Sequence, residues 1–312
     1  MMNAIPLISI CIPAYKRVHS LKRLLDSIEK QSFKNFEVVI TDDSPDESVQ
    51  KLIESYKKKF PLLYFKNPTS LGTPANWNAC IDKASGEWIK IMHDDDWFAN
   101  EQSLERFAHH TYGAKKFIFC NYLSIDEEKK TQIKSAISGT WIKRIAADPF
   151  SLYATNKIGP PSVTFIHKSV MEKFDETLKW LVDIEFYIHI LSKKNQFISI
   201  HEPLIHIGLN EAQVTNACFL NPSVELPEGM YILEKYGLKK LKNIWVYDAW
   251  WRLFRNMHIK SEQELEHYVS RKWPRVLVSM LNDQQKYSSH LLRNGFFSKA
   301  MMFLSYKKMQ PH

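Results

Sequence analysis

The apolar segments of the first 120 residues place the strongest constraint on the fold. Five short apolar runs alternate with amphipathic stretches that carry apolar residues at helical spacing. The runs lie at 7–12, 36–41, 62–67, 87–92 and 116–122. Because apolar residues dominate each run and do not alternate strictly with polar ones, the runs indicate strands that are buried on both faces, as in a parallel sheet covered by helices. The pattern therefore predicts a Rossmann-like α/β fold, and Ser20 is expected to be the N-cap of its first helix.

Acidic residues follow two of these predicted strands directly. Asp42 and Asp43 end the second run, and Asp94, Asp95 and Asp96 come after the fourth. In open parallel sheets, ligands bind at the carboxyl ends of the strands. Three adjacent carboxylates repel one another unless water or a cation neutralises them, and Mg²⁺ or Mn²⁺ prefers such oxygen ligands. The alternative is that both clusters are acidic turns that cap the helices after them.

A further carboxylate, Asp183, lies near the start of a predicted amphipathic helix. It is either a partner of the helix dipole or a general base that takes a proton from an acceptor hydroxyl.

Positive charge is concentrated in the C-terminal part of the chain. The net charge is +8, and from Met230 onward there are 15 Lys and Arg residues against 6 Asp and Glu. Trp, Phe and Tyr residues are interleaved with the basic ones at 239–260 and 295–308. This mixture predicts either helices that lie on an anionic membrane or aromatic side chains that pack on the catalytic domain or at a homodimer interface. No nucleic-acid recognition module is visible, so nucleic acid is not expected as a partner.

Four segments together resemble the inverting glycosyltransferase family 2, which has the GT-A fold. They are SICIPAYKR, VVITDDSPDES, NPTSLGTPANWNACIDKASGEWIKIMHDDDWF and FDETLKWLVDIEFYIHI, in the family's order and spacing. The resemblance implies a catalytic domain at 1–223, with a nucleotide-binding half at 1–120 and an acceptor-binding half at 121–223. Residues 224–312 then form a helical, basic and aromatic region. The implied donor is a nucleotide-sugar, most commonly a UDP-sugar, bound with Mn²⁺ or Mg²⁺.

The resemblance also assigns roles to individual residues. The nucleotide contacts that it implies are Pro13, Ala14, Tyr15, Asp42, Asp43, Asn76 and Asp94. Asp95 occupies the metal-ligand place, with Asp96 as an additional ligand. Asp183 matches the general base, with Glu185 as the alternative.

The sequence departs from the family pattern at several positions. His93 stands where the first Asp of the metal motif is usual, and Val182 where a Glu precedes the base. An Arg common near Asn76 is missing, so Lys83 is a candidate replacement. Basic positions of a later loop read Gly208 and Asn210, which leaves His206 as the nearest basic residue.

The resulting prediction is an enzyme that transfers a sugar to an acceptor hydroxyl in bacterial surface polysaccharide synthesis, such as capsule or O-antigen. The acceptor is a saccharide, lipid-linked if the C-terminal helices contact the inner face of the cytoplasmic membrane. The sequence has no secretory signal and no long apolar span, which predicts a cytoplasmic protein. Two alternatives remain: a nucleotidyl- or phospho-sugar-transferring enzyme, whose Gly-rich phosphate loop is missing near the first strand, and a non-catalytic scaffold.

Overall fold

The structure, a computed structural model, describes residues 6–193, 196–209 and 217–309. The chain forms two compact units. The sheet unit consists of 1–147, 157–177 and 189–211, and the helical unit consists of 148–156, 178–188 and 212–312, as far as these residues are described. The sequence-based division at residue 223 stays a prediction about domains.

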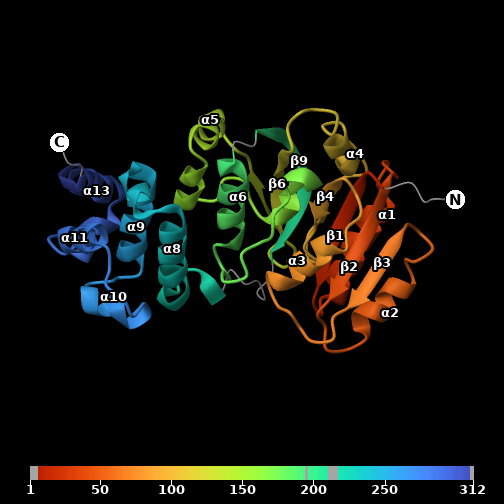
Figure 1. The fold of residues 1–312 in the computed structure, drawn as a ribbon, viewed down its shortest axis with the longest axis horizontal. Coiled ribbons are helices and arrows are strands. Elements are labelled where there is room, and N and C mark those ends of the chain that lie inside the picture. Colours follow the sequence, from red (N-terminus) through yellow and green to blue (C-terminus); the bar gives the residue numbers. More distant parts are fainter. Residues whose placement is uncertain (1–5, 194–195, 210–216, 310–312) are drawn as a thin grey trace. The chain divides into compact units, whose positions relative to one another are not determined.

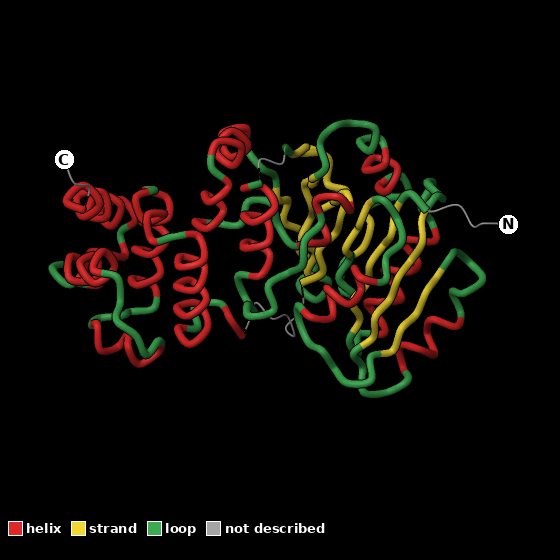
Figure 2. Tube along the Cα trace, viewed as in Figure 1, coloured by secondary structure: helices red, strands yellow, loops and turns green. Residues whose placement is uncertain are grey.

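All strands of the described residues lie in the sheet unit and form a single mixed sheet (Figures 1 and 2). The strands are β1 Ile8–Ala14, β2 Phe36–Asp42, β3 Leu62–Lys66, β4 Trp88–Ile91, β5 Trp97–Phe98, β6 Phe117–Asp126, β7 Thr131–Ser135, β8 Thr164–His167 and β9 Phe197–Leu209. Their order is β3-β2-β1-β4-β8-β6-β9-β5, with β7 paired to β6. The strands from β3 to β4 are parallel, and β8 runs antiparallel between β4 and β6. The predicted mostly parallel sheet is therefore present, with antiparallel strands from its second half.

Helices connect the parallel strands, as the apolar pattern predicts. Those of the sheet unit are α1 Val18–Glu29, α2 Ser48–Glu54, α3 Ala75–Asp82, α4 Ser103–Ala108 and α5 Gly139–Ala147, and α6 Val182–Ser192 is shared by both units. Every residue of β1 and β2 is buried, which requires cover on both faces of the sheet. Helix α1 buries Leu21, Leu24, Leu25 and Ile28, a stripe at helical spacing. The expected N-cap at Ser20 is wrong, because α1 begins at Val18 and Arg17 is its N-cap residue.

The helical unit holds the C-terminal helices. They are α8 Pro222–Tyr236, α9 Ile244–Asn256, α10 Glu262–Tyr268, α11 Arg275–Gln284, α12 Ser289–Arg293 and α13 Gly295–Met309. Short 3₁₀ helices are η1 Pro149–Ala154, η2 Pro161–Val163, η3 Lys168–Val170 and η4 Leu238–Lys242. The aromatic residues of α9 form the core of this unit. Trp250, Trp251 and Phe254 are at most 1% exposed, and Trp250 and Phe254 both contact the Trp273 ring. Tyr247, Trp250, Trp251 and Phe254 of α9 therefore pack inside the protein and do not face a membrane, whereas Trp245 is only half-buried.

Candidate active site

The predicted nucleotide residues of the sheet unit lie where β1, β2 and β4 end. These strands are parallel neighbours, so their carboxyl ends meet at one edge. Asp42 is the last residue of β2, and residues 93–96 turn immediately beyond β4, with the Asp96 N–H 3.1 Å from the His93 carbonyl oxygen. The turn after β1 is tied to the turn after β2, because the Asp43 N–H donates to the Ala14 carbonyl at 3.0 Å.

Asp42 and Asp43 are buried and already accept hydrogen bonds. Asp42 Oδ2 accepts from the Tyr64 hydroxyl at 2.7 Å and from Lys66 Nζ at 3.1 Å, and Asp42 Oδ1 accepts from the Ser44 N–H. Asp43 accepts from the Gly72 N–H at 2.8 Å and from the Leu71 N–H at 3.1 Å. Asp43 therefore shapes the loop that leads to α3.

Asn76 continues the same network. Its Oδ1 accepts from Asn67 Nδ2 at 2.9 Å, and its Nδ2 donates to the Thr41 carbonyl at 3.3 Å. Asn76 is only 4% exposed, so its amide fixes the start of α3 against β2.

The loop after β1 contributes an exposed ring. Pro13 and Ala14 are buried in β1, whereas Tyr15 is 47% exposed. The Tyr15 N–H donates to Asp94 Oδ2 at 3.0 Å, and Lys16 has a left-handed backbone with φ 62°. This turn brings Tyr15 beside Asp94 and leaves its ring open to a flat ligand such as a base.

Arg17 is the residue that the sequence analysis missed at this edge. Its Nη1 lies 3.2 Å from Asp94 Oδ1 and 2.7 Å from Asp95 Oδ2. Both carboxylate side chains are 8% exposed, so a cation already neutralises part of the acidic cluster. Its position directly after the loop of the first strand was the available signal.

Burial and mutual repulsion disfavour the charged forms of the carboxylates in the acidic cluster. Burial, followed by the charge of Asp95, raises the pKa of Asp94 to about 7, although Arg17 opposes the shift. The same two causes hold the pKa of Asp96 well above its usual range, against hydrogen bonds from the Ser162 hydroxyl and the Gly208 N–H. Buried carboxylates that favour protonation are stabilised as anions when a positive charge binds them.

Three side chains at this turn could hold a divalent cation. One donor atom each from His93, Asp95 and Asp96 lies within 4.8 Å of the others. His93 Nδ1 lies 3.9 Å from Asp96 Oδ2, and its other ring nitrogen, Nε2, is buried without a hydrogen-bond partner. Burial lowers the pKa of His93 to about 4, so its imidazole is neutral and able to coordinate. The two carboxylates suit Mn²⁺ or Mg²⁺, and His93 adds a nitrogen donor to the predicted Asp95 and Asp96, which Mn²⁺ accepts more readily than Mg²⁺.

Arg23 and strand β9 contact the backbone of this turn and fix its position. Arg23 Nη2 donates to the Asp95 carbonyl at 3.0 Å, and the Arg23 guanidinium lies 3.6 Å from the Trp97 ring centroid. A Cβ added to Gly208 would come within 2.3 Å of the Asp95 carbonyl oxygen. Only glycine fits where β9 crosses this turn.

For the other proposed basic substitutes, Lys83 and His206, the contacts are with aromatic rings, and their role at the diphosphate stays a prediction. Lys83 is the C-cap of α3, the end that returns to the start of β4, and its ammonium lies 5.2 Å from the Phe65 ring. His206 packs edge-on against Trp97, with ring centroids 5.3 Å apart. Asn210 lies outside the described residues.

Asp183 belongs to the helical unit, in the first turn of α6. Asn156 Nδ2 donates to Asp183 Oδ2 at 2.6 Å, and the Ile184 N–H donates to Oδ1 at 2.8 Å. Burial raises the pKa of Asp183 to about 6 despite these hydrogen bonds. A carboxylate with this pKa is a competent general base near neutral pH.

Glu185, the alternative base, is fixed inside the helical unit. It is 2% exposed and accepts from Lys235 Nζ at 2.9 Å and from the Tyr236 hydroxyl at 2.7 Å. These partners favour Asp183 for the role of base.

Glu228 in α8 supports the start of α6 and was not foreseen. Its carboxylate accepts from three successive N–H groups, those of Lys179 at 2.7 Å, Trp180 at 3.0 Å and Leu181 at 2.8 Å. Backbone N–H groups before a helix lack partners within it, so Glu228 fixes the segment that carries Asp183.

Comparison with known proteins decides the family. The family model for glycosyl transferase family 2 matches residues 9–174, which is more than half of the chain. The chain belongs to glycosyl transferase family 2. The resemblance stated from the sequence is thereby confirmed.

Curated relatives of this family 2 chain include several named glycosyltransferases. An uncharacterized glycosyltransferase of Rickettsia typhi is 25% identical over 68% of this chain and 66% of its own length. The putative colanic acid biosynthesis glycosyl transferase WcaA of Escherichia coli is 26% identical over 68% of this chain and 76% of its own length. A GalNAc(5)-diNAcBac-PP-undecaprenol beta-1,3-glucosyltransferase of Campylobacter jejuni is 30% identical over 55% of each chain. Several relatives thus extend well beyond the part that this chain matches.

Solved structures confirm the predicted GT-A fold. TarS 1–349 of S. aureus, in complex with UDP-GlcNAc, has a TM-score of 0.56 at 17% identity and covers 96% of this chain and 79% of its own. Mannosyltransferase PcManGT of Pyrobaculum calidifontis, in complex with GDP-Man and Mn²⁺, has a TM-score of 0.55 at 12% identity and covers 98% and 87%.

Proposed function

We propose that this chain is an inverting glycosyltransferase that moves a sugar from a UDP-sugar to an acceptor hydroxyl in bacterial surface polysaccharide synthesis. The observation that carries the proposal is the buried cluster of Asp94, Asp95 and Asp96 at the carboxyl ends of parallel strands. Relatives named for colanic acid synthesis and for a glucosyl transfer onto an undecaprenol-linked glycan support the substrate class.

In this proposal the sheet unit binds the nucleotide. The exposed ring of Tyr15 stacks on the base, and Asp42 at the end of β2 accepts from the base or ribose. Pro13 and Ala14 shape the loop that holds Tyr15, while Asp43 and Asn76 order the turn before α3. Asp94 orients the Tyr15 backbone through its hydrogen bond and contacts the ribose.

Asp95 and Asp96, with His93, would hold the divalent cation. When bound, that cation neutralises charge on the diphosphate that leaves during transfer. Arg17, 2.7 Å from Asp95, would offer its guanidinium to a phosphate oxygen if the cation displaced it from Asp95.

Asp183 would act as the base. Its carboxylate removes the proton of the acceptor hydroxyl while the oxygen attacks the anomeric carbon on the face opposite the leaving diphosphate, so the configuration inverts. The bond from the anomeric carbon to the phosphate oxygen breaks, and the nucleoside diphosphate takes that electron pair. The transition state has oxocarbenium character.

The direct test is Asp183→Asn, measured for both transfer and donor binding. We expect transfer to fall by about 10²–10⁴-fold, the usual contribution of a general base, with donor affinity nearly unchanged. Asn156→Ala is the matched variant, because it removes a hydrogen-bond donor to Asp183 but keeps the Asp183 carboxylate. If Asp183→Asn lost donor binding and folding together, Asp183 would be structural and the assignment wrong.

The acceptor is proposed to be a lipid-linked saccharide, reached at the inner face of the cytoplasmic membrane. Within the part of the chain that the structure describes, no helix is long and apolar enough to span a bilayer. Helix α13 instead turns large apolar and basic side chains outward: Phe296, Lys299, Phe303, Leu304, Lys307 and Lys308. Its inward side carries Ser298, Met302 and Ser305.

This distribution favours a membrane over a second copy of the chain. Phe296 is 95% exposed and Leu304 51%, at a spacing that places them on one side of the helix with Lys299 and Lys307. A symmetric dimer through this face would bring like charges together, whereas an anionic lipid surface neutralises them.

Vesicle flotation tests the membrane contact. The full chain should float with phosphatidylglycerol vesicles and less with phosphatidylcholine alone. Phe296→Ser with Leu304→Ser should abolish flotation, and Tyr112→Ser with Ile133→Ser, at exposed positions of the sheet unit, should not. Lack of flotation by the full chain, or a concentration-dependent dimer that the α13 variant disrupts, would contradict the membrane contact.

A further inference from the structure

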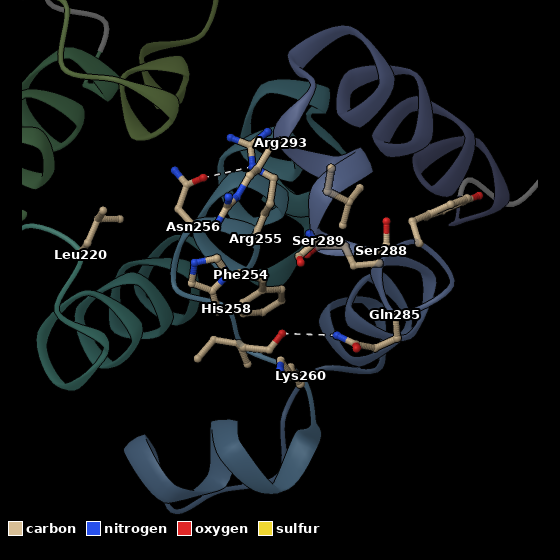
Figure 3. A pocket seen from close by; sticks show the side chains of 14 residues that line it. Leu220, Phe254, Arg255, Asn256, His258, Lys260, Gln285, Ser288, Ser289 and Arg293 are labelled. Carbon is tan, nitrogen blue, oxygen red and sulfur yellow. Dashed lines mark hydrogen bonds between the residues drawn. The ribbon is translucent and has the colours of Figure 1, made fainter.

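A half-open pocket of about 690 Å³ lies in the helical unit, and none of its lining residues belongs to the candidate active site. It is lined by the end of α9 with the turn after it, the end of α11, the start of α12 and Leu220 (Figure 3). A cavity of this size is in the usual range of small-molecule sites.

The lining contains basic residues and no acidic ones. Arg255, His258, Lys260 and Arg293 line the cavity, and no Asp or Glu does (Figure 3). Within residues 217–309, no carboxylate forms an ion pair with Lys260 or Arg293. All four side chains thus line one hollow whose lining contains no carboxylate, and Glu264, outside the lining, accepts from the Lys260 backbone N–H at 2.7 Å rather than from its ammonium.

Arg255 is the most constrained of the four. Its Nε donates to Asn256 Oδ1 at 3.0 Å and its Nη1 to Ser298 Oγ at 2.9 Å, which are neutral acceptors. Burial and the charge of Arg252 lower the pKa of Arg255, a direction that an added anion would reverse.

Pairing of basic residues with helix dipoles explains only part of this arrangement. Arg255 lies in the last turn of α9 and Arg293 in the last turn of α12, where a cation complements the helix dipole. Dipole partners need not point to the same space, and His258 and Lys260 lie beyond the end of α9.

The remaining lining adds apolar surface and neutral donors. Phe254, Ile259 and Leu292 are at most 5% exposed and form an apolar wall, while Ser288 and Ser289 supply hydroxyl groups. Cations, hydroxyls and an apolar wall together match a phosphate group that is attached to a less polar body.

We propose that this cavity of the helical unit is a binding site for a phosphate- or diphosphate-bearing ligand, held by Arg255, Lys260 and Arg293. The site goes beyond the proposed glycosyl transfer and does not depend on it. The ligand is either a soluble phosphate compound or the headgroup of a lipid phosphate.

Isothermal titration with two probes separates these sources. Inorganic pyrophosphate represents the soluble compound, and dihexanoyl phosphatidic acid the lipid headgroup. The titrations use the full chain with Asp95→Asn and no divalent cation, so that the predicted donor site does not contribute. Binding of pyrophosphate indicates a soluble ligand, and binding of the lipid probe alone indicates a headgroup.

Two variants locate the binding. Lys260→Gln with Arg293→Gln, both exposed positions, should weaken the bound probe at least tenfold without altering the fold. Lys239→Gln with Lys272→Gln removes the same charge from exposed positions outside the cavity and should leave affinity unchanged. Arg255→Gln should weaken the same probe.

The proposal is overturned if neither probe binds, or if both double variants weaken binding equally. Equal weakening would mean that only the net positive charge of this region attracts anions. Failure here leaves the Asp183→Asn and donor-binding results untouched, so the two proposals are tested separately.

Discussion

Single residues at the end of β4 decide how a cation can bind this protein. Arg17 Nη1 lies 2.7 Å from Asp95 Oδ2, and Asp95 also belongs to the three-residue group with His93 and Asp96. A divalent cation must therefore share Asp95 with a guanidinium or displace it. Competition between the two positive charges follows directly from Coulomb repulsion at this distance.

Arg17→Ala tests this competition. We expect Mn²⁺ to bind the variant several-fold more tightly in the absence of nucleotide, since Asp94 and Asp95 lose their internal counter-charge. Isothermal titration with Mn²⁺ measures the effect, and Arg17→Lys should fall between the two. Unchanged or weaker Mn²⁺ binding by Arg17→Ala would show that Asp95 is not a ligand.

The pKa of Asp183, raised to about 6, predicts the pH dependence of transfer. A base works only when deprotonated, so the turnover number should fall as the pH decreases through about 6. Asn156 donates a hydrogen bond that favours the charged carboxylate. Asn156→Ala should therefore move this acid limb to higher pH. A limb that stays in place, or moves to lower pH, would assign the titration to another group.

At the scale of elements, two contacts between distant segments position the candidate active site. Strand β9 crosses the turn after β4 so closely that a Cβ on Gly208 would overlap the Asp95 carbonyl oxygen. Helix α8 places Glu228 against the N–H groups before α6. Both contacts act on the backbone that carries a functional carboxylate, rather than on the carboxylate itself.

Glu228→Gln should loosen the start of α6. One of three backbone N–H bonds is weakened or lost, and an unsatisfied buried donor costs about 1–3 kcal/mol. We expect lower stability to denaturant and a lower turnover number, with donor affinity unchanged because the sheet unit is unaltered. Glu225→Gln, also in α8, is the control. A variant with reduced stability but full turnover would remove Glu228 as a positioning residue.

Gly208→Ala should disturb the metal turn specifically. Its methyl group has no room beside the Asp95 carbonyl, so β9 or the turn must shift. Mn²⁺ affinity should fall, whereas Gly113→Ala, where a Cβ meets no atom closer than 3.7 Å, should bind Mn²⁺ normally. Equal affinities in the two variants would indicate that the turn position does not matter for the metal.

At the scale of the whole molecule, the sequence predicted the order of strands and helices in the first 120 residues because the parallel strands β1, β2 and β4 are buried and rich in apolar residues. Edge strand β3 is half-exposed, so the expectation of burial on both faces is wrong for that run. The sequence also placed Asp42 and Asp94–Asp96 at strand ends, since acidic residues directly follow the runs. Arg17, His93 and Glu228 were missed as functional residues, because their roles depend on contacts between segments far apart or on burial. The tight fit at Gly208 is likewise a distance of the folded chain, which no local pattern records.

The carboxylates of the proposed mechanism come from both units. Asp42 and Asp94–Asp96 belong to the sheet unit, whereas Asp183 belongs to the helical unit. That they face one shared hollow stays a prediction. The aromatic residues of the C-terminal helices also differ, because α9 buries Trp250, Trp251 and Phe254 while α13 exposes Phe296 and Phe303.

The most direct measurement is thermal unfolding with Mn²⁺ and each of UDP, GDP, CDP, ADP and dTDP. At least one nucleoside diphosphate, with UDP the expected one, should raise the melting temperature, because a ligand that binds only the folded state stabilises it. The rise should vanish in Asp95→Asn and persist in Glu128→Gln, an exposed carboxylate of the same unit. If no nucleotide stabilises the protein, or if Asp95→Asn responds like the unaltered chain, the carboxylates at the strand ends do not hold a cation and diphosphate.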